Sequence, residues 1–338
     1  MGILVKIVMM PCGEYFGRKW NLLDIVTAAV FLTMHCLCAM APFHFTWPAF
    51  WLAFALYVVT GVGVTLSFHR NLAHRSFRIP KWLEYLFAYF GVLSLQGSPI
   101  EWVSSHRYHH QFTDTVKDVH SPLQGFWFSH MGWILDSGSR FGNVTKNTPN
   151  SLSLSLSFSL LNTFTYTTTV HSFCSTLQWK LLQYGGLKNV EDLKRQAFYR
   201  FLHHTFLLHS FLLGALLYAV GGLPFLTWGV GVRMVCLFHS TMLVNSAGHI
   251  WGQQVYHTGD TSRNNWWLGL LTFGEGWHNN HHAFDYSARQ GFEWWQIDVT
   301  WYVIRFLEAI GLATDVKTPT EAQKERKALH HKTMATQN

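Results

Sequence analysis

Four long apolar stretches, separated by polar segments, dominate the hydropathy pattern of the chain. They cover about residues 22–40, 49–68, 205–220 and 225–244. A helix needs about 20 apolar residues to cross a bilayer, and these stretches come close to that length. Short segments join the first to the second and the third to the fourth. The pattern therefore predicts four transmembrane helices in two hairpins with tight outer turns.

The positive charges favour one orientation of these hairpins. Neither outer turn contains Lys or Arg, whereas basic residues such as Arg18, Lys19, Arg70 and Lys81 flank the inner ends. By the positive-inside rule, both termini and the central region are expected to face the cytoplasm. Arg233 lies within the fourth stretch, and its cost in lipid predicts that it faces protein or a polar cavity.

A further apolar stretch, residues 82–95, is too short to span a bilayer. Lys81, Glu84 and Gln96 lie within it or at its ends. We predict an interfacial or partly buried helix here.

The composition of the 338-residue chain supports membrane insertion. Hydrophobic residues make up 49% and charged residues only 13%, about half the usual charged share. This excludes a disordered chain, while a mean hydropathy of +0.10 is too low for a transporter that lies in the membrane throughout. Four buried helices of a soluble protein are the alternative to membrane spans.

Cysteine and histidine usage indicates what kind of metal site to expect. The five cysteines include no C-x-x-C pair, which argues against a disulfide scaffold and a thiolate zinc site. The chain has 21 histidines. Any bound metal is therefore expected to have imidazole ligands.

The N-terminal segment carries none of the common targeting signals. Lys6 stands where a myristoylation signal has Ser or Thr, and a Ser/Arg-rich transit peptide and a signal-peptide cleavage site are both missing. We expect a protein of the endoplasmic reticulum membrane with both termini in the cytosol. A plastid membrane is the alternative.

Nine histidines stand in clusters with metal-ligand spacing. The clustered residues are His69 and His74, then His106, His109 and His110, then His249, which follows Asn245 by one helical turn, and finally His278, His281 and His282. The two triplets have the spacing i, i+3, i+4, which places their side chains on one face of a helix. The first pair has the spacing i, i+5, about 140° apart on a regular helix, so its rings reach different metals or need a bend.

All nine histidines follow an even number of predicted crossings and are expected to converge on the cytoplasmic side. They exceed what one tetrahedral site uses, so two metals are the economical number, and imidazole alone suits Zn, Cu, Fe or Ni. Carboxylate-rich di-iron proteins use two Glu-x-x-His motifs, whereas this chain has only one, at Glu275. We therefore expect Glu275 to accept a hydrogen bond from a ligand, a role also open to Glu101, Asp114 and Asp118.

Five motifs resemble those of the membrane-bound fatty acyl desaturases. They are HRNLAH, EWVSSHRYHH, GFWFSHMGW, NSAGHIWG and GEGWHNNHHAF. The similarity is greatest to the plant-type delta-9-like acyl-CoA or acyl-lipid desaturases and covers roughly residues 18–143 and 185–320.

This resemblance implies an all-α integral membrane protein whose four transmembrane helices carry a cytosolic helical cap with a di-iron site. The nine clustered histidines would be ligands of two Fe²⁺ ions, with Asn245 holding a metal-bound water and no separate acid–base residue. The family uses O2 to introduce a cis double bond into a saturated acyl chain on CoA or a glycerolipid. Its electrons come from cytochrome b5 or, in plastids, ferredoxin.

The chain departs from the family pattern after the second cluster, in TDTVKDVHSP. Val116 and Val119 replace the usual acidic residue and proline, while Asp114, Asp118 and His120 remain. We expect weakened support of the ligands rather than loss of activity. No heme-binding HPGG segment is present, so the electron donor is expected to be a separate protein.

We predict a single desaturase domain over residues 1–320 and a polar C-terminal tail over 321–338. About residues 147–180 break the family pattern with strict Ser/Leu alternation and a Thr run. An isolated strand in a helical protein has no sheet to join. We hypothesise a retained intron or a gene-model error here, the alternative being a genuine loop insertion.

Two other functions are compatible with the histidines. A hydroxylase or methyl oxidase of the same class would return oxygen to the substrate, and a non-enzymatic histidine-rich metal transporter or a bis-histidine heme protein would catalyse nothing. A transporter is expected to place its ligands within the spans, whereas these clusters lie outside them. Membrane lipid is an expected partner, and nucleic acid is not.

Overall fold

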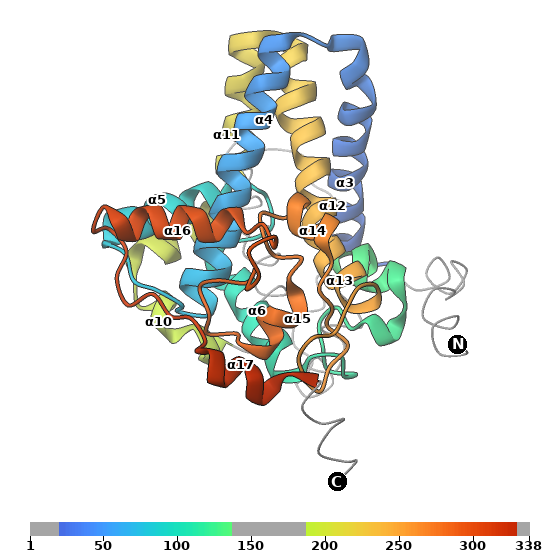
Figure 1. The fold of residues 1–338 in the computed structure, drawn as a ribbon. Coiled ribbons are helices and arrows are strands. Elements are labelled where there is room, and N and C mark those ends of the chain that lie inside the picture. Colours follow the sequence, from blue (N-terminus) through green and yellow to red (C-terminus); the bar gives the residue numbers. More distant parts are fainter. Residues whose placement is uncertain (1–19, 137–186, 330–338) are drawn as a thin grey trace.

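The computed structural model describes residues 20–136 and 187–329, and these ranges are helical (Figure 1). Within them no β-strand occurs, and β-type pairing is limited to isolated bridges. The Ser/Leu-rich segment at 147–180 lies outside the described residues. The elements are α3 (Leu22–Met40), η1 (Ala41–His44), α4 (Trp47–Val62), η2 (Gly63–Ala73), α5 (Lys81–Val92), α6 (Pro99–Phe112), η3 (Pro122–Gln124), η4 (Phe128–Gly132), α7 (Trp133–Leu135), η6 (Leu187–Val190), α10 (Glu191–Lys194), α11 (Ala197–Leu226), η7 (Thr227–Val232), α12 (Arg233–Asn245), α13 (Ala247–Ile250), α14 (Trp266–Leu271), α15 (His278–Ala283), α16 (Val299–Ala309) and α17 (Glu321–Lys327).

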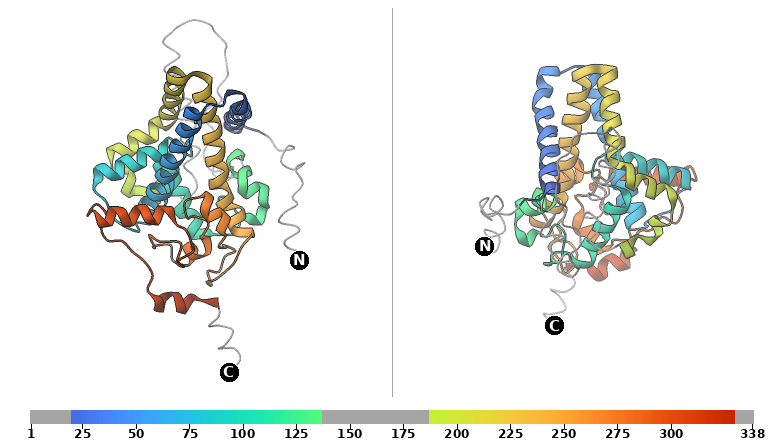
Figure 2. Two further views of the ribbon diagram at one scale, coloured as in Figure 1. Left: turned by 45° about the horizontal axis from the view of Figure 1, so that its top comes forward. Right: turned by 180° about the vertical axis from the view of Figure 1, so that it is seen from behind.

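Three helical stretches of the described chain are long and apolar enough to cross a membrane: Leu22–His44, Trp47–Ala73 and Ala197–Ile250. The third has 54 residues and is not straight, because Gly222 has φ 63° and ψ −150°, which is not helical. The four apolar stretches of the sequence thus give three candidate spans, since the last two form one broken segment. In both figures its two arms, α11 and α12, lie beside α3 and α4 (Figures 1 and 2).

A glycine allows close packing inside this bundle. A Cβ added at Gly231 in η7 would lie 2.6 Å from the backbone atoms Leu37 C and Cys38 N of α3. No side chain fits at that separation. The two helical segments therefore touch through their backbones.

Arg233 is enclosed by protein, as predicted. Its side chain is buried, and its guanidinium donates to the carbonyl oxygens of Gly229 and Leu93, at 2.6 and 2.9 Å. Both acceptors are uncharged backbone carbonyl oxygens. The cation is thereby kept away from lipid.

Two helices lie across the base of the bundle (Figure 1). One is α5, within the stretch predicted to be interfacial, and the other is α16. Both carry large exposed apolar side chains, including Trp82 and Leu86 on α5 and Phe306 on α16. Such a face suits the boundary between lipid and water.

The remaining helices form a cap beneath the bundle, and α17 closes its underside (Figure 1). The described part of the predicted polar tail packs on this cap. Lys324 and Lys327 of α17 lie over the rings of Phe292 and Phe284, at 5.5 and 5.1 Å from the ring centroids. The tail therefore supports the segment that follows α15.

Candidate metal centre

His69 and His74 come together because η2 is a π-helix. The amide of His74 donates to the carbonyl oxygen of His69 at 3.1 Å, five residues back along the chain. This wider turn places the two imidazoles on one side, with ring centroids 4.9 Å apart. Of the two alternatives that the sequence left open for this pair, the distorted helix holds.

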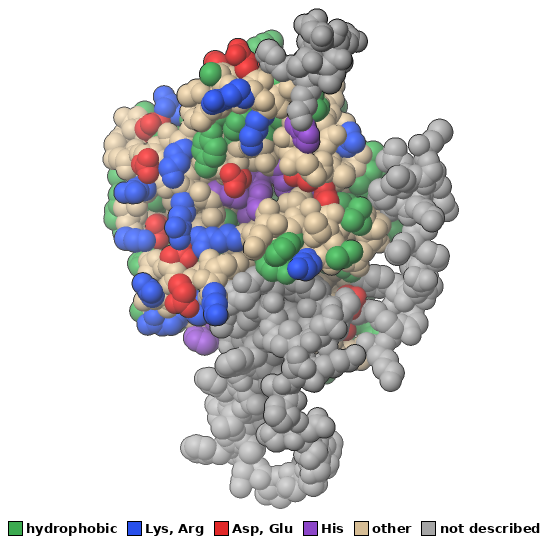
Figure 3. All heavy atoms as spheres, turned by 90° about the horizontal axis from the view of Figure 1, so that it is seen from below, with side chains coloured by type: hydrophobic (Ala, Val, Ile, Leu, Met, Phe, Trp, Pro, Cys, Tyr) green, Lys and Arg blue, Asp and Glu red, His purple; other side chains and the backbone are tan. Residues whose placement is uncertain are grey.

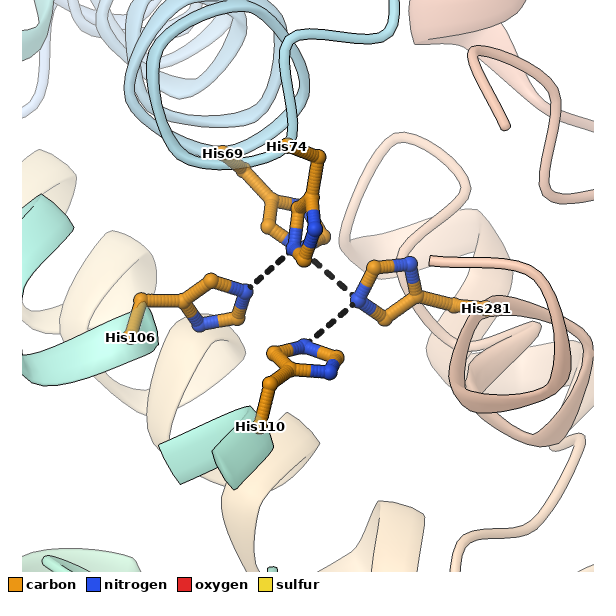
Figure 4. Close-up of side chains that lie close together, drawn as sticks. All are labelled: His69, His74, His106, His110 and His281. Atoms are coloured by element: carbon orange, nitrogen blue, oxygen red, sulfur yellow. Dashed lines mark hydrogen bonds between the residues drawn. The ribbon is translucent and has the colours of Figure 1, made fainter. Parts of the chain in front are cut away.

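The nine clustered histidines form two adjoining groups, and the ligand nitrogens within each group lie within 4.8 Å of one another. Cluster A consists of His69, His74, His106, His110 and His281 (Figure 4), and cluster B of His109, His249, His278 and His282. Each triplet is therefore divided between the clusters. Since neighbouring positions on α6 and α15 point to different clusters, these two helices tie the clusters together.

In cluster A the imidazole Nε2 atoms face one another (Figure 4). Those of His74 and His106 are 2.8 Å apart, and that of His281 lies 2.9 Å from His110 and 3.1 Å from His69. Two nitrogens bound at about 2.1 Å to one metal and about 90° apart are separated by about 3 Å. The spacing therefore fits imidazoles that share a metal ion.

Cluster B has the same spacing. Nε2 of His278 lies 3.0 Å from that of His249 and 3.1 Å from that of His282. Nε2 of His109 is buried and has no hydrogen-bond partner among the described residues. A metal ion in this group would give that nitrogen a partner.

Burial favours the neutral form, which is the form of imidazole that binds metal, in six of the nine clustered histidines, whereas at His249 the neighbouring Asp114 raises the pKa against the effect of burial. Desolvation first, and then the neighbouring histidines and arginines, hold the pKa values well below the ordinary 6.5 for His74, His106, His110, His278, His281 and His282. Their lone pairs are consequently available at neutral pH.

Four carboxylates accept hydrogen bonds from Nδ1 of clustered histidines. The pairs are His69 with Glu275, His109 with Asp118 at 2.9 Å, His249 with Asp114 at 3.3 Å, and His282 with Asp260 at 2.9 Å. A bond at Nδ1 fixes the tautomer and turns Nε2 toward the metal position. One of these pairs belongs to cluster A and three belong to cluster B.

Glu275 also belongs to a buried ionic network. Arg70 donates to Glu275 Oε1 at 2.8 Å and to Asp298 Oδ2 at 3.0 Å, and the Gln290 amide donates to Glu275 Oε2 at 3.0 Å. Burial alone would raise the pKa of Glu275, but Arg70 and His69 lower it to about 2. The carboxylate is therefore ionised and fixes η2 to the segment before α16.

The segment after α6 holds the cluster B carboxylates in place. Asp118 Oδ2 accepts from the amide of Asp114 at 2.9 Å, and Asp114 Oδ2 accepts from the amide of Thr261 at 2.6 Å. Burial would raise the pKa of Asp118, but His109 and His120 hold it well below its usual value. Nδ1 of His120 lies 3.8 Å from Asp118, beyond hydrogen-bond reach.

Two residues singled out from the sequence form no hydrogen bond with a clustered histidine in the part of the chain that the structure describes. Glu101 accepts from the amide and hydroxyl of Ser98 and lies 3.8 Å from His203, so no contact joins it to either cluster. Asn245 stands one turn before His249 and lines the cavity described below, and its side-chain amide donates a long hydrogen bond to the sulfur of Met242, at 3.9 Å.

Sequence reasoning missed Asp260, Asp298 and Arg70. Asp260 is 22 residues before its partner His282, so no spacing rule connects them. Arg70 follows His69 directly, and its charge in the sequence indicates only the inner end of a membrane span. The available signal for Asp260 is that it begins the segment DTSRNNWW, which lies within the range 185–320 that resembles the desaturases.

An apolar cavity opens onto both clusters. Its walls include His69 and His106 of cluster A, His109 and His278 of cluster B, and Asn245. The remainder of the lining comes from the bundle, from Trp102 of α6, and from α14 and the turn after it, with Tyr57, Val64, Leu237, Leu271 and Phe273 among its residues. A flexible apolar chain fits such a lining.

Tyr57 ties three elements together beside this cavity. Its hydroxyl lies 3.0 Å from Ser240 Oγ on α12 and donates to the carbonyl oxygen of Leu271 at 2.8 Å. Its ring packs on Phe273, with centroids 5.4 Å apart. The cavity is thus bounded by fixed side chains.

Comparison with known proteins gives a consistent result. The family described as fatty acid desaturase matches residues 45–314. A chloroplastic palmitoyl-monogalactosyldiacylglycerol delta-7 desaturase of Arabidopsis thaliana is 53% identical over 93% of this chain and 74% of its own length. Delta-9 acyl-lipid desaturase 1 of the same plant is 52% identical over 92% and 89%, and icosanoyl-CoA 5-desaturase of Limnanthes douglasii is 52% identical over 92% and 77%.

Proposed function

The chain belongs to the fatty acid desaturase family and is a fatty acyl desaturase, and on this premise we propose that clusters A and B each hold one Fe²⁺ ion. The ligands would be the five histidines of cluster A and the four of cluster B. When bound, the irons would supply the oxidant, made from O2, that removes hydrogen from a saturated acyl chain. Asn245, which lines the cavity, would hold a metal-bound water on the side of cluster B.

The observation that carries this proposal is the apolar cavity shared by the two clusters. A methylene group in a saturated chain offers no acid or base handle. It must be held rigidly beside the oxidant, so positioning accounts for much of the catalysis. Trp102 and Phe273 supply rigid aromatic walls, and their apolar surfaces exclude water.

The reaction has a fixed balance. The desaturation removes two hydrogen atoms from the acyl chain while O2 is reduced to two water molecules. The reduction of O2 also consumes two further electrons and two protons. We assign the electrons to a separate donor protein, cytochrome b5 or, in a plastid, ferredoxin. No side chain of the chain is assigned as the acid or base.

We propose that α3, α4 and the two arms of the broken α11–α12 segment each cross the membrane, which gives four crossings. Supporting this, the turns opposite the cap contain no Lys or Arg, whereas the cap is rich in both. Both termini would then lie in the cytosol, or in the stroma if the membrane is a plastid one. We place the protein in the endoplasmic reticulum, with the plastid as the alternative because one similar protein is named chloroplastic.

The acyl carrier is either a glycerolipid or CoA. The names of similar proteins include a galactolipid, acyl-lipids and an acyl-CoA. The product would be a cis-unsaturated chain of delta-9 type.

The test is expression in a host that requires unsaturated fatty acids, with gas chromatography of total fatty acids and mapping of the double bond. We expect growth without added unsaturated fatty acid and a product that has lost two hydrogen atoms. A product that has instead gained one oxygen atom identifies a hydroxylase.

The assignment of the ligands is tested in the same host with His106→Ala in cluster A and His278→Ala in cluster B. Both variants should lose desaturation and bound iron, because a lost imidazole ligand is not readily replaced. His257→Ala is the matched control, since this exposed cap histidine belongs to neither cluster. Near-normal activity of either cluster variant would overturn the ligand assignment.

A further inference from the structure

We propose that a second pocket of the cap binds the uncharged sugar headgroup of a membrane glycolipid. This pocket, called the headgroup pocket, has a volume of about 520 Å³, which lies within the usual range of small-molecule sites. Among the described residues it shares no part of its lining with the acyl cavity or with clusters A and B. The inference therefore goes beyond the proposed function, because binding at this pocket requires neither iron nor turnover.

The headgroup pocket lies close to the foot of the transmembrane bundle. Its walls include the start of α14 and the segment just before α16, and Figure 1 shows α14 at the foot of α12 and α16 across the base of the bundle. The end of α14 is fixed to the bundle, because the carbonyl oxygen of Leu271 accepts from Tyr57 of α4 at 2.8 Å. Trp266 and Leu270 on the same helix are exposed, as expected for side chains at the level of the lipid headgroups.

Tryptophan side chains form much of the wall of this pocket. Trp251, Trp266 and Trp295 line it and are 44%, 63% and 49% exposed. Trp277 lies deeper and is fixed, because its indole N–H donates to the carbonyl oxygen of Ile297 at 2.8 Å. The face of an indole ring is negatively polarised and attracts the C–H groups on the apolar side of a sugar ring. Exposed indoles around a pocket therefore suit a sugar better than an acyl chain, which needs no polar partner.

Buried amide side chains form the floor of the pocket. Asn280 accepts from the side-chain amide of Asn264 at 2.7 Å and donates to Gln296 Oε1 at 3.1 Å. The same Oε1 atom also accepts from the backbone amides of Phe292 and Glu293, at 2.7 and 3.1 Å. Gln296 is thereby held in place, while its Nε2 group has no hydrogen-bond partner among the described residues. The floor is fixed before a ligand arrives, which lowers the entropic cost of binding.

Three further polar groups of the lining are available to a ligand. They are the exposed amide of Gln253, the hydroxyl of Tyr256 and the exposed carboxylate of Glu293. Within the described ranges none of these three side-chain groups has a hydrogen-bond partner. The amide and the phenol donate, and the carboxylate accepts. Such a mixture matches sugar hydroxyl groups, because each hydroxyl both donates and accepts.

The charge of the lining disfavours a phosphate group, whether of CoA or of a phospholipid. Among the described residues the lining contains no Lys or Arg, and it includes the carboxylate of Glu293. Arg263 and Arg289 lie nearby, but they donate to the carbonyl oxygens of Gly252 and Phe292, at 3.2 and 2.9 Å. Figure 3 shows Lys and Arg side chains gathered on the underside of the cap, which offers phosphates a more favourable surface. The headgroup pocket therefore fits a headgroup that is polar and uncharged.

The experiment measures lipid binding to the full-length protein in detergent by native mass spectrometry. The probes are monogalactosyldiacylglycerol, phosphatidylcholine and diacylglycerol, all with the same acyl chains. We expect the wild type to bind the galactolipid about tenfold more tightly than the other two lipids, and Trp266→Ala and Gln253→Ala each to remove most of this preference. Trp294→Ala is the matched control, because this tryptophan is 89% exposed and adjoins Trp295 but does not line the pocket.

The outcomes decide the proposal independently of desaturation. Equal affinity of the wild type for the three lipids, or a preference for phosphatidylcholine, would overturn it. So would wild-type galactolipid binding in both pocket variants, and Gln253→Ala keeps this comparison valid because its exposed side chain supports no other described residue. If free galactose displaces the galactolipid at an equal concentration, the ligand is a soluble sugar and the assignment to a lipid is wrong. A failed desaturation assay overturns the proposed function alone, since the binding measurement involves no turnover.

Discussion

Replacing Asp118 with asparagine tests how cluster B is oriented. Asp118 is 3% exposed, and its Oδ1 accepts the Nδ1 hydrogen of His109 at 2.9 Å while Oδ2 accepts the amide of Asp114 at 2.9 Å. Asparagine has nearly the same shape but only one accepting oxygen. Whichever way its amide turns, an N–H group meets either the His109 ring or the Asp114 backbone donor.

The expected loss follows from these contacts. A hydrogen bond to a charged group contributes about 1.5–3 kcal/mol, so its loss corresponds to about a 10- to 100-fold lower affinity for the metal of cluster B. His69 and Glu275 are untouched, so cluster A should keep its metal. Asp118→Asn should therefore lose iron at cluster B first as chelator is added.

The assay combines iron content with product formation. Purified protein is equilibrated with graded chelator, iron per chain is determined, and the same variant is scored by gas chromatography in the expression host. Asp285→Asn serves as the control, because this exposed carboxylate contacts no clustered histidine among the described residues. If Asp118→Asn keeps wild-type iron affinity and activity, the carboxylate does not orient His109 for metal binding.

Three further predictions follow from other contacts. Asp260→Asn should also lower iron content, because it weakens the 2.9 Å bond to His282 Nδ1, and an unchanged iron titration would contradict this. Burial raises the pKa of Glu101 from 4.5 to about 7, despite opposing bonds from Ser98, so the folded state holds its proton more tightly than the unfolded chain. Wild-type stability should therefore fall as pH rises from about 4.5 to 7, and Glu101→Gln should flatten this slope in thermal melts without changing iron content. Gly231→Ala should lower the melting temperature through a loss of about 1–3 kcal/mol, since the added methyl group meets the α3 backbone at 2.6 Å, and an unchanged melting curve would rule out that close approach.

The motifs predicted the family correctly because they contain the chemistry itself. Histidines with the spacing i, i+3, i+4 and the long apolar stretches are local features, and comparison with known proteins confirms the desaturase family. The membrane helices could be predicted for the same reason, because long apolar stretches are also local features of the sequence. The number of crossings stays a prediction, because the described chain has three candidate spans and the turn at Gly222 joins the last two predicted helices into one broken segment.

The carboxylates show where local reasoning ends. Glu275 was expected near a ligand from its spacing to His278, yet its imidazole partner is His69, more than 200 residues away. Glu101 stands closer in sequence to His106 but turns to Ser98, because its side chain completes the cap of α6. The pairing of carboxylate with imidazole depends on which loops meet, and no spacing encodes that.

The sequence by itself determined the apolar helices, the imidazole character of the metal site and the enzyme family, since each depends on residue types at short range. Only the tertiary structure decided how nine histidines divide into five and four. It did so by winding η2 as a π-helix, which brings His69 and His74 to one side, and by seating α6 and α15 so that neighbouring turns face different clusters.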